Sequence, residues 1–111
     1  MDNLEFYRHT IETFLCRYAE IPYSYGEIDQ HLIIDQDRNH FILFDVGWQQ
    51  KRRVHGCVTH VQIIDNKIWI QRDGIEDGIT DDLVEAGIPK DKIVLGFQPP
   101  NVRPHTGYAV A

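Results

Sequence analysis

The sequence predicts an α+β domain, in which a long first helix packs on a mainly antiparallel sheet of four or more strands, followed by a short second helix and an extended C-terminal arm. Three observations lead to this prediction. Apolar residues recur at helical spacing over residues 4–18, four β-rich runs separated by turn residues follow, and a short capped helical pattern occupies residues 80–87. With 111 residues the chain has length for one core, so we expect residues 1–111 to form a single domain.

The first helix is predicted from its apolar stripe, which consists of Leu4, Tyr7, Ile11, Phe14, Leu15 and Tyr18. Charged residues fall largely between these positions, as expected for a helix with one buried face. A side-chain oxygen of Asn3 or Asp2 can cap its start, and Pro22 stops it because proline disfavours helical geometry in the preceding residue. We interpret the aromatic stripe as core.

The four strands are predicted at residues 31–35, 40–48, 54–64 and 67–73, in meander order. Residues 22–30 are expected to form a loop and residues 36–39 a turn. The second strand is apolar at successive positions, so we expect it to be central in the sheet and covered on both faces. Asp65 and Asn66 predict a tight hairpin, because both residue types tolerate positive φ.

The second helix is predicted from residues that favour the start and the end of a helix. Thr80 can cap its start, Asp81 and Asp82 favour its positive N-terminal end, Gly87 can take the left-handed closing position, and Pro89 forbids continuation.

A fifth strand is predicted at residues 92–97, followed by an extended tail after Pro99 and Pro100. The tail keeps Val102, Tyr108 and Val110, so we expect it to pack against the rest of the domain.

Composition restricts the function. The net charge of -6 disfavours autonomous DNA binding, because such binding draws most of its affinity from neutralised phosphates. Cys16 and Cys57 are expected to be reduced thiols, since two cysteines make a poor disulfide framework. The sequence shows no long apolar run and no signal-peptide pattern at its start, which predicts a cytoplasmic protein.

A metal site is conceivable at His55, Cys57 and His60. On a regular strand, however, His55 and Cys57 share one face and His60 points to the other, so the three cannot converge without a bulge, which Gly56 could mark. A fourth ligand would have to come from His31, His40, His9 or Asp45. We interpret the histidines as ordinary strand residues and expect no metal.

Catalytic patterns are weak. The carboxylates at the start of the second helix could hold a divalent cation or act as a general acid, but we interpret them as helix N-terminal charge and solvated loop; they are Asp73, Glu76, Asp77, Asp81 and Asp82. The sequence has no nucleophile elbow, phosphate loop or dinucleotide fingerprint. We therefore expect no catalytic residue and no cofactor.

Two features favour contacts with another protein. Lys51, Arg52 and Arg53 form the densest basic run, which can touch a phosphate or an acidic protein surface or simply be a soluble hairpin tip. Trp69 falls on the polar side of its strand, where either a partner or the C-terminal tail can cover it, and Trp48 could extend the same patch. A small sheet that is apolar on both faces, with only two helices, lacks cover, which self-association or a second protein would supply.

Several sequence segments together resemble the XisI proteins, the fdxN element excision controlling factors, along the whole chain. The matching segments are 35–38 with His40, 46–48, 53–56, His60, 67–71, 77–79, 87–89, 94–97, and 103–104 with 106–107. The resemblance implies a XisI-like fold and a role in site-specific excision of a DNA element during heterocyst differentiation in cyanobacteria. It also implies a separate recombinase and a companion protein, XisH, which is similar to nucleases in fold, and it supplies no family-wide active site.

We therefore expect a non-enzymatic controlling factor that binds a XisH-like protein, associates indirectly with a recombinase–DNA complex and can form a homodimer. The predicted partner-binding residues are Trp48, Lys51, Arg52, Arg53, Trp69 and Arg103. Two alternatives stay open. One is a direct DNA-binding module that uses residues 51–53 and Arg103, and the other is a metal-dependent hydrolase that uses His55, His60 and the acidic loop.

Overall fold

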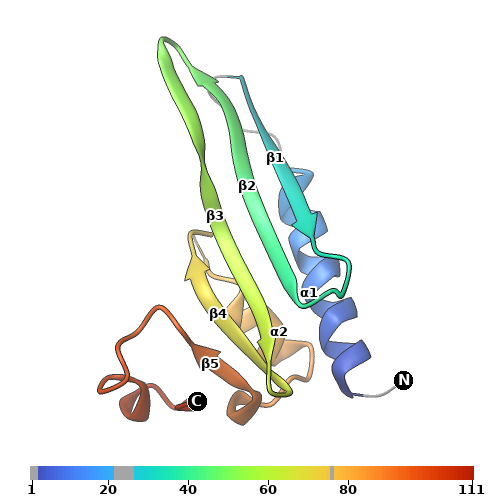
Figure 1. Cartoon of the computed structure of the whole chain (residues 1–111), viewed down its shortest axis with the longest axis vertical. Helices are drawn as coiled ribbons and strands as arrows, with labels where there is room; N and C mark the ends of the chain where they lie inside the picture. Colours follow the sequence, from blue (N-terminus) through green and yellow to red (C-terminus); the bar gives the residue numbers. More distant parts are fainter. Residues whose placement is uncertain (1–2, 22–26, 76) are drawn as a thin grey trace.

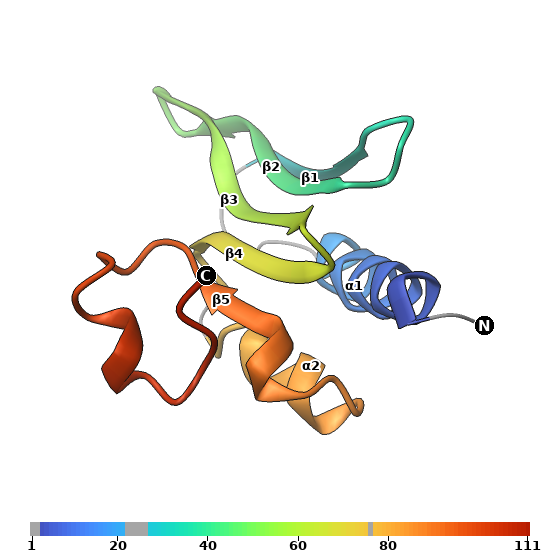
Figure 2. The ribbon, with the colours of Figure 1, turned by 60° about the horizontal axis from the view of Figure 1, so that its bottom comes forward.

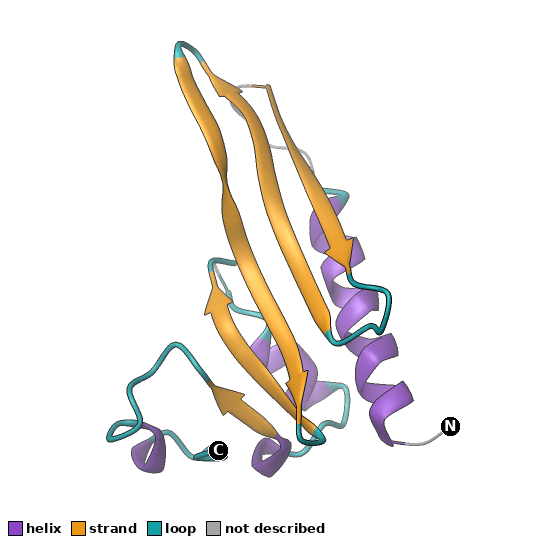
Figure 3. Cartoon of the chain, in the orientation of Figure 1, coloured by secondary structure: helices purple, strands orange, loops and turns teal. Residues whose placement is uncertain are grey.

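The computed structural model describes residues 3–21, 27–75 and 77–111 of the chain (Figure 1). Its elements are α1 (Asn3–Ala19), β1 (Glu27–Ile34), β2 (His40–Gln49), β3 (Arg52–Ile64), β4 (Lys67–Asp73), α2 (Thr80–Glu85) and β5 (Ile93–Leu95), with 3-10 turns at Lys90–Lys92 and Arg103–His105. The strands form one sheet in the order β1-β2-β3-β4-β5, antiparallel except for the parallel pair β4–β5 (Figure 3). The predicted α+β class and the meander of the first four strands are confirmed.

Helix α1 forms where the apolar stripe predicted it. Tyr7, Ile11 and Leu15 are buried on the side that packs on the sheet, in one cluster with Phe41 of β2 and Val61 of β3. The stripe is therefore core, as interpreted. Two of the predicted boundary residues, Asp2 and Pro22, lie outside the described residues.

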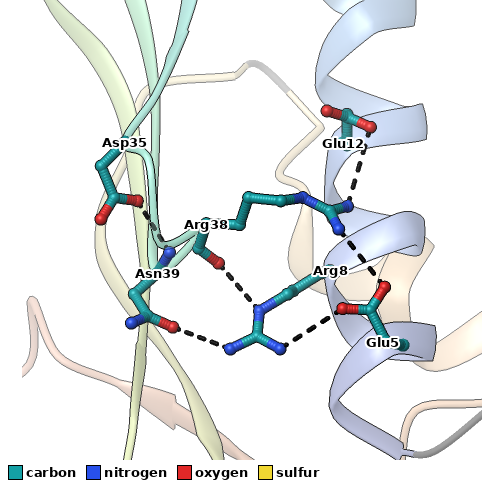
Figure 4. Close-up of polar contacts among 6 residues, drawn as sticks. All are labelled: Glu5, Arg8, Glu12, Asp35, Arg38 and Asn39. Carbon is teal, nitrogen blue, oxygen red and sulfur yellow. Dashed lines mark hydrogen bonds and ion pairs between the residues drawn. The ribbon is translucent and has the colours of Figure 1, made fainter.

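A polar clamp fixes α1 to the turn between β1 and β2 (Figure 4). The Arg8 guanidinium donates to the Arg38 carbonyl oxygen and to Asn39 Oδ1, both at 3.0 Å, and lies 3.5 Å from a Glu5 carboxylate oxygen. The other Glu5 oxygen accepts from Arg38 at 3.3 Å. One arginine thus satisfies two turn acceptors, which sets the position of the helix along the sheet.

The turn itself is held by Asp35. Its Oδ1 accepts the backbone N–H groups of Asn39 at 2.7 Å and His40 at 2.8 Å, and the bond from His40 is the main reason that the pKa of the Asp35 carboxyl lies below its ordinary value. Arg38 takes a positive φ of 57° to close the turn. The turn predicted at residues 36–39 is confirmed, and so is the second hairpin, where Asp65 and Asn66 have φ of 50° and 65°.

The sheet has two different faces. Paired residues of adjacent strands share a face, so the register assigns every strand residue to one side. One side packs on α1 and α2, and we call it the helix-covered face. The other side of β1, β2 and β3 we call the open face, and its side chains are those of Glu27, Asp29, His31 and Ile33 from β1, His40, Ile42, Phe44, Val46 and Trp48 from β2, and Arg53, His55, Cys57, His60 and Gln62 from β3.

The molecule is elongated because β2 and β3 run past the rest of the fold. The hairpin that joins them projects beyond α1 and β4 (Figure 1). The radius of gyration is 14.7 Å, whereas a compact chain of this length has about 13 Å. We call residues 44–57, the far part of this hairpin, the arm.

Two strand predictions need correction. β1 begins at Glu27, so residues 27–30, which we expected in a loop, are strand, because β2 is long enough to pair with them from Asp45 to Trp48. β2 is an interior strand as predicted, but the described residues cover its open face only in part. On the open face Phe44 is partly buried and Trp48 is 48% exposed.

A bulge also changes the prediction for the β3 histidines. Leu43 pairs with Thr59 while the next residue, Phe44, pairs with Cys57, so Val58 is an extra residue. This extra residue moves His60 to the side of His55 and Cys57. The three residues therefore share the open face, contrary to the regular-strand expectation, and the bulge lies at Val58 instead of Gly56.

Helix α2 starts without the predicted Thr80 cap. Thr80 is the first helical residue, Ile79 precedes it as N-cap, and no side chain caps the helix. Asp73 at the end of β4 instead accepts the Ile79 N–H at 3.0 Å. Burial raises the pKa of this Asp73 carboxyl, although the bond from Ile79 pulls it down. Gly87 closes the helix with φ 108°, as predicted.

The C-terminal segment, residues 96–111, covers β4 and β5 on the side away from the helices (Figure 2). The Ala109 N–H donates to the Ile93 carbonyl oxygen at 2.9 Å, and the Lys67 ammonium donates to the Ala111 carbonyl oxygen. Val94 points to the same side as Trp69 and is fully buried. The expectation that the tail packs on the domain is confirmed.

Candidate partner-binding surfaces

The first group of predicted site residues lies at the tip of the arm. Lys51, Arg52 and Arg53 are exposed, and the Arg53 guanidinium stacks over the Trp48 ring with its carbon 5.2 Å from the ring centroid. The same guanidinium donates to the Gly47 carbonyl oxygen at 3.3 Å. The tip therefore presents an oriented cation on an aromatic ring that is about half exposed.

Gly47 explains how β1 reaches this end of the sheet. A Cβ at Gly47 would lie 2.0 Å from the Glu27 carbonyl oxygen, so only glycine permits the first residue of β1 to approach β2 this closely. Glu27 is consequently placed beside Trp48 in the strand register.

The second group, Trp69 and Arg103, lies elsewhere. The Arg103 guanidinium carbon is 5.1 Å from the Trp69 ring centroid, and its nitrogens donate to the carbonyl oxygens of Gln98 at 3.0 Å and Gly96 at 3.3 Å. Trp69 is on the side away from the helices, as predicted. The sequence allowed either a partner or the C-terminal tail to cover Trp69. In the structure the C-terminal segment covers it, through Arg103.

The six predicted residues therefore do not form one patch. Trp69 pairs with Gln62, nine positions along β3 from Arg53, and nine strand residues span roughly 30 Å. Trp48, Lys51, Arg52 and Arg53 are brought together, and Trp69 and Arg103 are brought together at the other end of the sheet.

The open face combines a central apolar row with charged borders. Ile42, Phe44, Val46 and Trp48 follow one another along β2, and Ile33 of β1 beside them is 49% exposed. An apolar row of this length on a side that the described part of the chain leaves open is typical of an interaction surface.

The borders of this row carry opposite charges at the arm end. On β1, Glu27 and Asp29 are both exposed, and on β3 the corresponding positions hold Arg53 and His55. Sequence reasoning missed the acidic border because it placed residues 27–30 in a loop. The signal that could have revealed it is the alternation of Glu27, Asp29 and His31 with intervening residues.

Four of the six histidines lie on the open face: His31, His40, His55 and His60. His40 Nδ1 and His60 Nε2 are 3.1 Å apart with stacked rings. Burial, with a smaller contribution from His40, lowers the pKa of His60 below its ordinary value. This shift favours the neutral form of the His60 imidazole.

The metal-site hypothesis finds no support in this geometry. Within the described residues no group of three or more histidine, cysteine or acidic side chains is arranged to hold a metal ion. His55 and His60 lie on the open face, whereas Asp73 pairs with Thr59 on the helix-covered face. The two histidines and Asp73 of the acidic loop therefore lie on opposite sides of the sheet.

Cys16 and Cys57 are both free thiols.

The acidic loop instead serves structure. Asp73 binds the start of α2, and Asp82 accepts the Tyr18 hydroxyl at 2.7 Å, which ties α2 to α1. This bond raises the pKa of Tyr18 to about 12. Within the predicted cluster, Glu76 lies outside the described residues.

A shallow depression lies beside the arm, where β3 continues past the end of β4. Its volume is about 540 Å³, and arginines line much of it, namely Arg52, Arg53 and Arg72. The pairing of β3 with β4 stops at Thr59, and the Gly74 N–H donates to the Val58 carbonyl oxygen at 2.7 Å. Toward the arm tip from Val58, the β3 edge is therefore not paired with β4.

No helix in the described ranges is long and apolar enough to cross a membrane.

Comparison with known proteins gives the family. The family model described as "XisI protein" matches residues 1–110. A XisI-like protein from Anabaena variabilis, solved at 1.30 Å, is 38% identical, with a TM-score of 0.89 over 98% of this chain and 100% of that one. The fdxN element excision controlling factor XisI from the same organism is 37% identical, with a TM-score of 0.84 over 99% of this chain and 100% of that one. No curated protein matches. A full-length match of this kind shows that the chain belongs to the XisI family.

Proposed function

We propose that this protein is a non-enzymatic factor that controls site-specific excision of a DNA element of the fdxN type during heterocyst differentiation. It acts by binding a XisH-like protein, and it reaches the recombinase–DNA complex through that partner. The name of the similar Anabaena variabilis structure, fdxN element excision controlling factor, supports the process. Contact with a partner is supported by the arm, whose far end carries the basic tip and an uncovered apolar face.

The arm suits protein recognition in three ways. It projects from the body, so that a partner can reach both of its sides. Trp48 offers a ring that is about half exposed, and tryptophan contributes heavily to binding energy at interfaces. Lys51, Arg52 and Arg53 supply positive charge on an otherwise acidic chain, which steers an acidic surface toward this end.

Direct DNA binding is weaker as an explanation because its predicted residues are separated. Arg103, within the C-terminal segment, stacks on Trp69, whereas residues 51–53 lie at the other end of the sheet. A DNA contact would therefore rest on the arm tip alone. If the tip did bind DNA, a gel shift would appear at low salt and disappear as salt rises.

Co-purification with the XisH-like protein tests the proposal. We expect Trp48→Ala and the double change Lys51→Gln with Arg52→Gln to lower partner recovery about tenfold or more, as is common for interface anchors. Phe97→Ala is the matched control for Trp48, because Phe97 is also 48% exposed but lies off the arm. Arg17→Gln with Lys90→Gln is the control for charge, since both residues are exposed elsewhere.

The outcomes separate the parts of the proposal. Failure of the unmodified protein to recover the partner would reject the XisH-like protein as its target. Equal recovery by arm and control variants would reject the arm as the contact. In cells, a variant that loses the partner should also lose control of excision, and normal excision in such a variant would contradict the proposed mechanism.

A further inference from the structure

We infer that the open face is the interface of a homodimer, in which a second copy packs face to face about a two-fold axis parallel to β2. The inference concerns the chain alone. It assigns Trp48 to the interface between copies, so in the dimer the basic tip at Lys51 and Arg52 is left for another partner, and Trp48→Ala acts on partner recovery through the dimer. It rests on how charge is distributed across the strands of the open face.

The residues of this face lie in rows that cross β1, β2 and β3. At the arm end one row reads Glu27, Trp48 and Arg53. The next row reads Asp29, Val46 and His55. Each row therefore runs from an acidic residue through an apolar one to a basic residue or a histidine.

This order is complementary to itself under one kind of symmetry. A two-fold axis that runs along β2 places β1 of one copy over β3 of the other and keeps each row at the same level. Glu27 then faces Arg53 of the second copy, and Asp29 faces His55 of the second copy. The apolar β2 side chains meet their own equivalents in the centre, about 10 Å from strand to strand, as in aligned β-sandwiches.

The alternative axis, across the strands, lacks this match. It would place β1 over β1 and β3 over β3, so that Glu27 and Asp29 would face no arginine or lysine and Arg53 would face no carboxylate. Charge complementarity therefore selects the axis along the strands. Within one copy Glu27 and Arg53 are two strands apart, roughly 10 Å, with Trp48 between them, whereas across the two-fold axis their side chains point toward one another.

The Arg53 guanidinium is held in a position from which it can form such an ion pair. It lies over the Trp48 ring and gives one hydrogen bond to the Gly47 carbonyl oxygen. A guanidinium has five N–H donors, so the others can meet a carboxylate. The apolar row supplies the rest of the interface through Ile42, Phe44 and Val46, which this chain covers only in part.

The dimer has one geometric consequence. Both arms point the same way, so the two basic tips lie side by side at one end of the assembly. Repulsion between them is reduced by Glu27 of each copy and by salt. The assembly would offer an acidic partner two adjacent basic tips.

Sedimentation of the purified chain from micromolar to sub-millimolar concentration is the first test. We expect the mass to double. A monomer throughout this range would overturn the inference.

Charge reversal tests the arrangement of the two copies. Glu27→Arg and Arg53→Glu each place like charges opposite one another, and each should weaken dimerisation by about tenfold or more. Glu27 and Arg53 are both exposed, so both variants should keep the fold, which circular dichroism checks. The matched controls are Glu85→Arg and Arg17→Glu, exposed residues of the helices that should leave the mass unchanged.

Mixing the two variants is the decisive step. In a dimer of one E27R copy and one R53E copy, both cross-copy pairs again join opposite charges, so the mixture should recover most of the lost dimer. A dimer that neither variant weakens, or a mixture that stays monomeric, would overturn the proposed axis.

Discussion

The two ends of one sheet are covered differently. At the C-terminal end, β4 and β5 are buried on one side by the helices and on the other by residues 96–111, so that Val94 is fully buried. At the arm end, β1, β2 and β3 have the same kind of apolar residues on the same side, yet Trp48 and Ile33 remain about half exposed. The comparison teaches that the described part of the chain covers this side of the sheet at the C-terminal end and leaves it open at the arm end, where we propose that a second polypeptide packs.

The two tryptophans, Trp69 and Trp48, differ in what covers their rings. Each ring lies under an arginine at about the same distance, 5.1 Å for Trp69 and 5.2 Å for Trp48. Arg103 belongs to a segment that continues across the sheet, and two carbonyl oxygens of that segment hold its guanidinium. Arg53 belongs to the strand next to Trp48, so nothing from a distant part of the described chain closes over that ring.

Isoleucine substitutions should show the largest contrast between the two ends. Ile70→Ala removes a fully buried β4 side chain, and we expect it to lower the free energy of unfolding by about 2–5 kcal/mol. Ile33→Ala on the open face should cost roughly 0.5 kcal/mol, measured by denaturant unfolding at concentrations where the chain is monomeric. Similar losses for the two variants would mean that the open face is covered within one chain.

Arg103→Ala should give the next largest effect. It removes the contact over Trp69 and two charge-assisted hydrogen bonds, for an expected loss of about 2 kcal/mol in unfolding free energy. Arg103→Lys should recover little, because lysine lacks the planar fork. Arg52→Ala, an exposed arginine at the arm tip, is the control and should stay within roughly 0.5 kcal/mol of the unmodified protein.

Arg8→Lys should have a smaller effect, on the side of the sheet that α1 covers. Lysine cannot reach the Arg38 carbonyl oxygen and Asn39 Oδ1 together, so we expect a loss of about 1 kcal/mol in unfolding free energy. Arg17→Lys on the exposed side of α1 is the control. If the melting temperature of Arg8→Lys equals those of Arg17→Lys and the unmodified protein, the clamp does not position the helix.

The smallest effect concerns pH. The pKa of His60 in the folded chain is lowered below its unfolded value near 6.5, so the unfolded state binds the proton first as pH falls. His60 therefore contributes a loss of stability that begins near pH 6.5 and continues until the folded protein also binds the proton. His60→Gln should flatten the fall in stability below about pH 6.5. Parallel curves for His60→Gln and the unmodified chain would show that its burial has no such consequence.

Local patterns predicted most of the fold. Helical spacing located α1, and the Asp65–Asn66 turn located the β3–β4 hairpin, because both depend on neighbouring residues. The start of β1 was missed because its polar residues are held in the sheet by the length of β2, which is a long-range effect. The Thr80 cap was wrong because Thr80 is itself the first helical residue and Ile79 takes the N-cap position, where Asp73, seven positions before Thr80, accepts the Ile79 N–H.

The candidate site was less predictable. The basic run and Trp48 are close in the sequence and close in the structure, so their grouping followed directly. The pairing of Trp69 with Arg103 depends on the path of the C-terminal segment, which local patterns do not specify. The shared face of His55 and His60 depends on the Val58 bulge, because one inserted residue reverses the side of every residue after it.

Hydroxyl-radical footprinting at rising protein concentration, with and without the XisH-like protein, tests most directly whether another polypeptide covers the open face. Trp48 and Phe97 have the same exposed fraction in one chain, 48%, and only Trp48 lies on that face. We predict that oxidation of Trp48 and Ile33 falls as assembly proceeds while oxidation of Phe97 stays constant. Unchanged oxidation of Trp48 under conditions where the mass shows assembly would contradict the account.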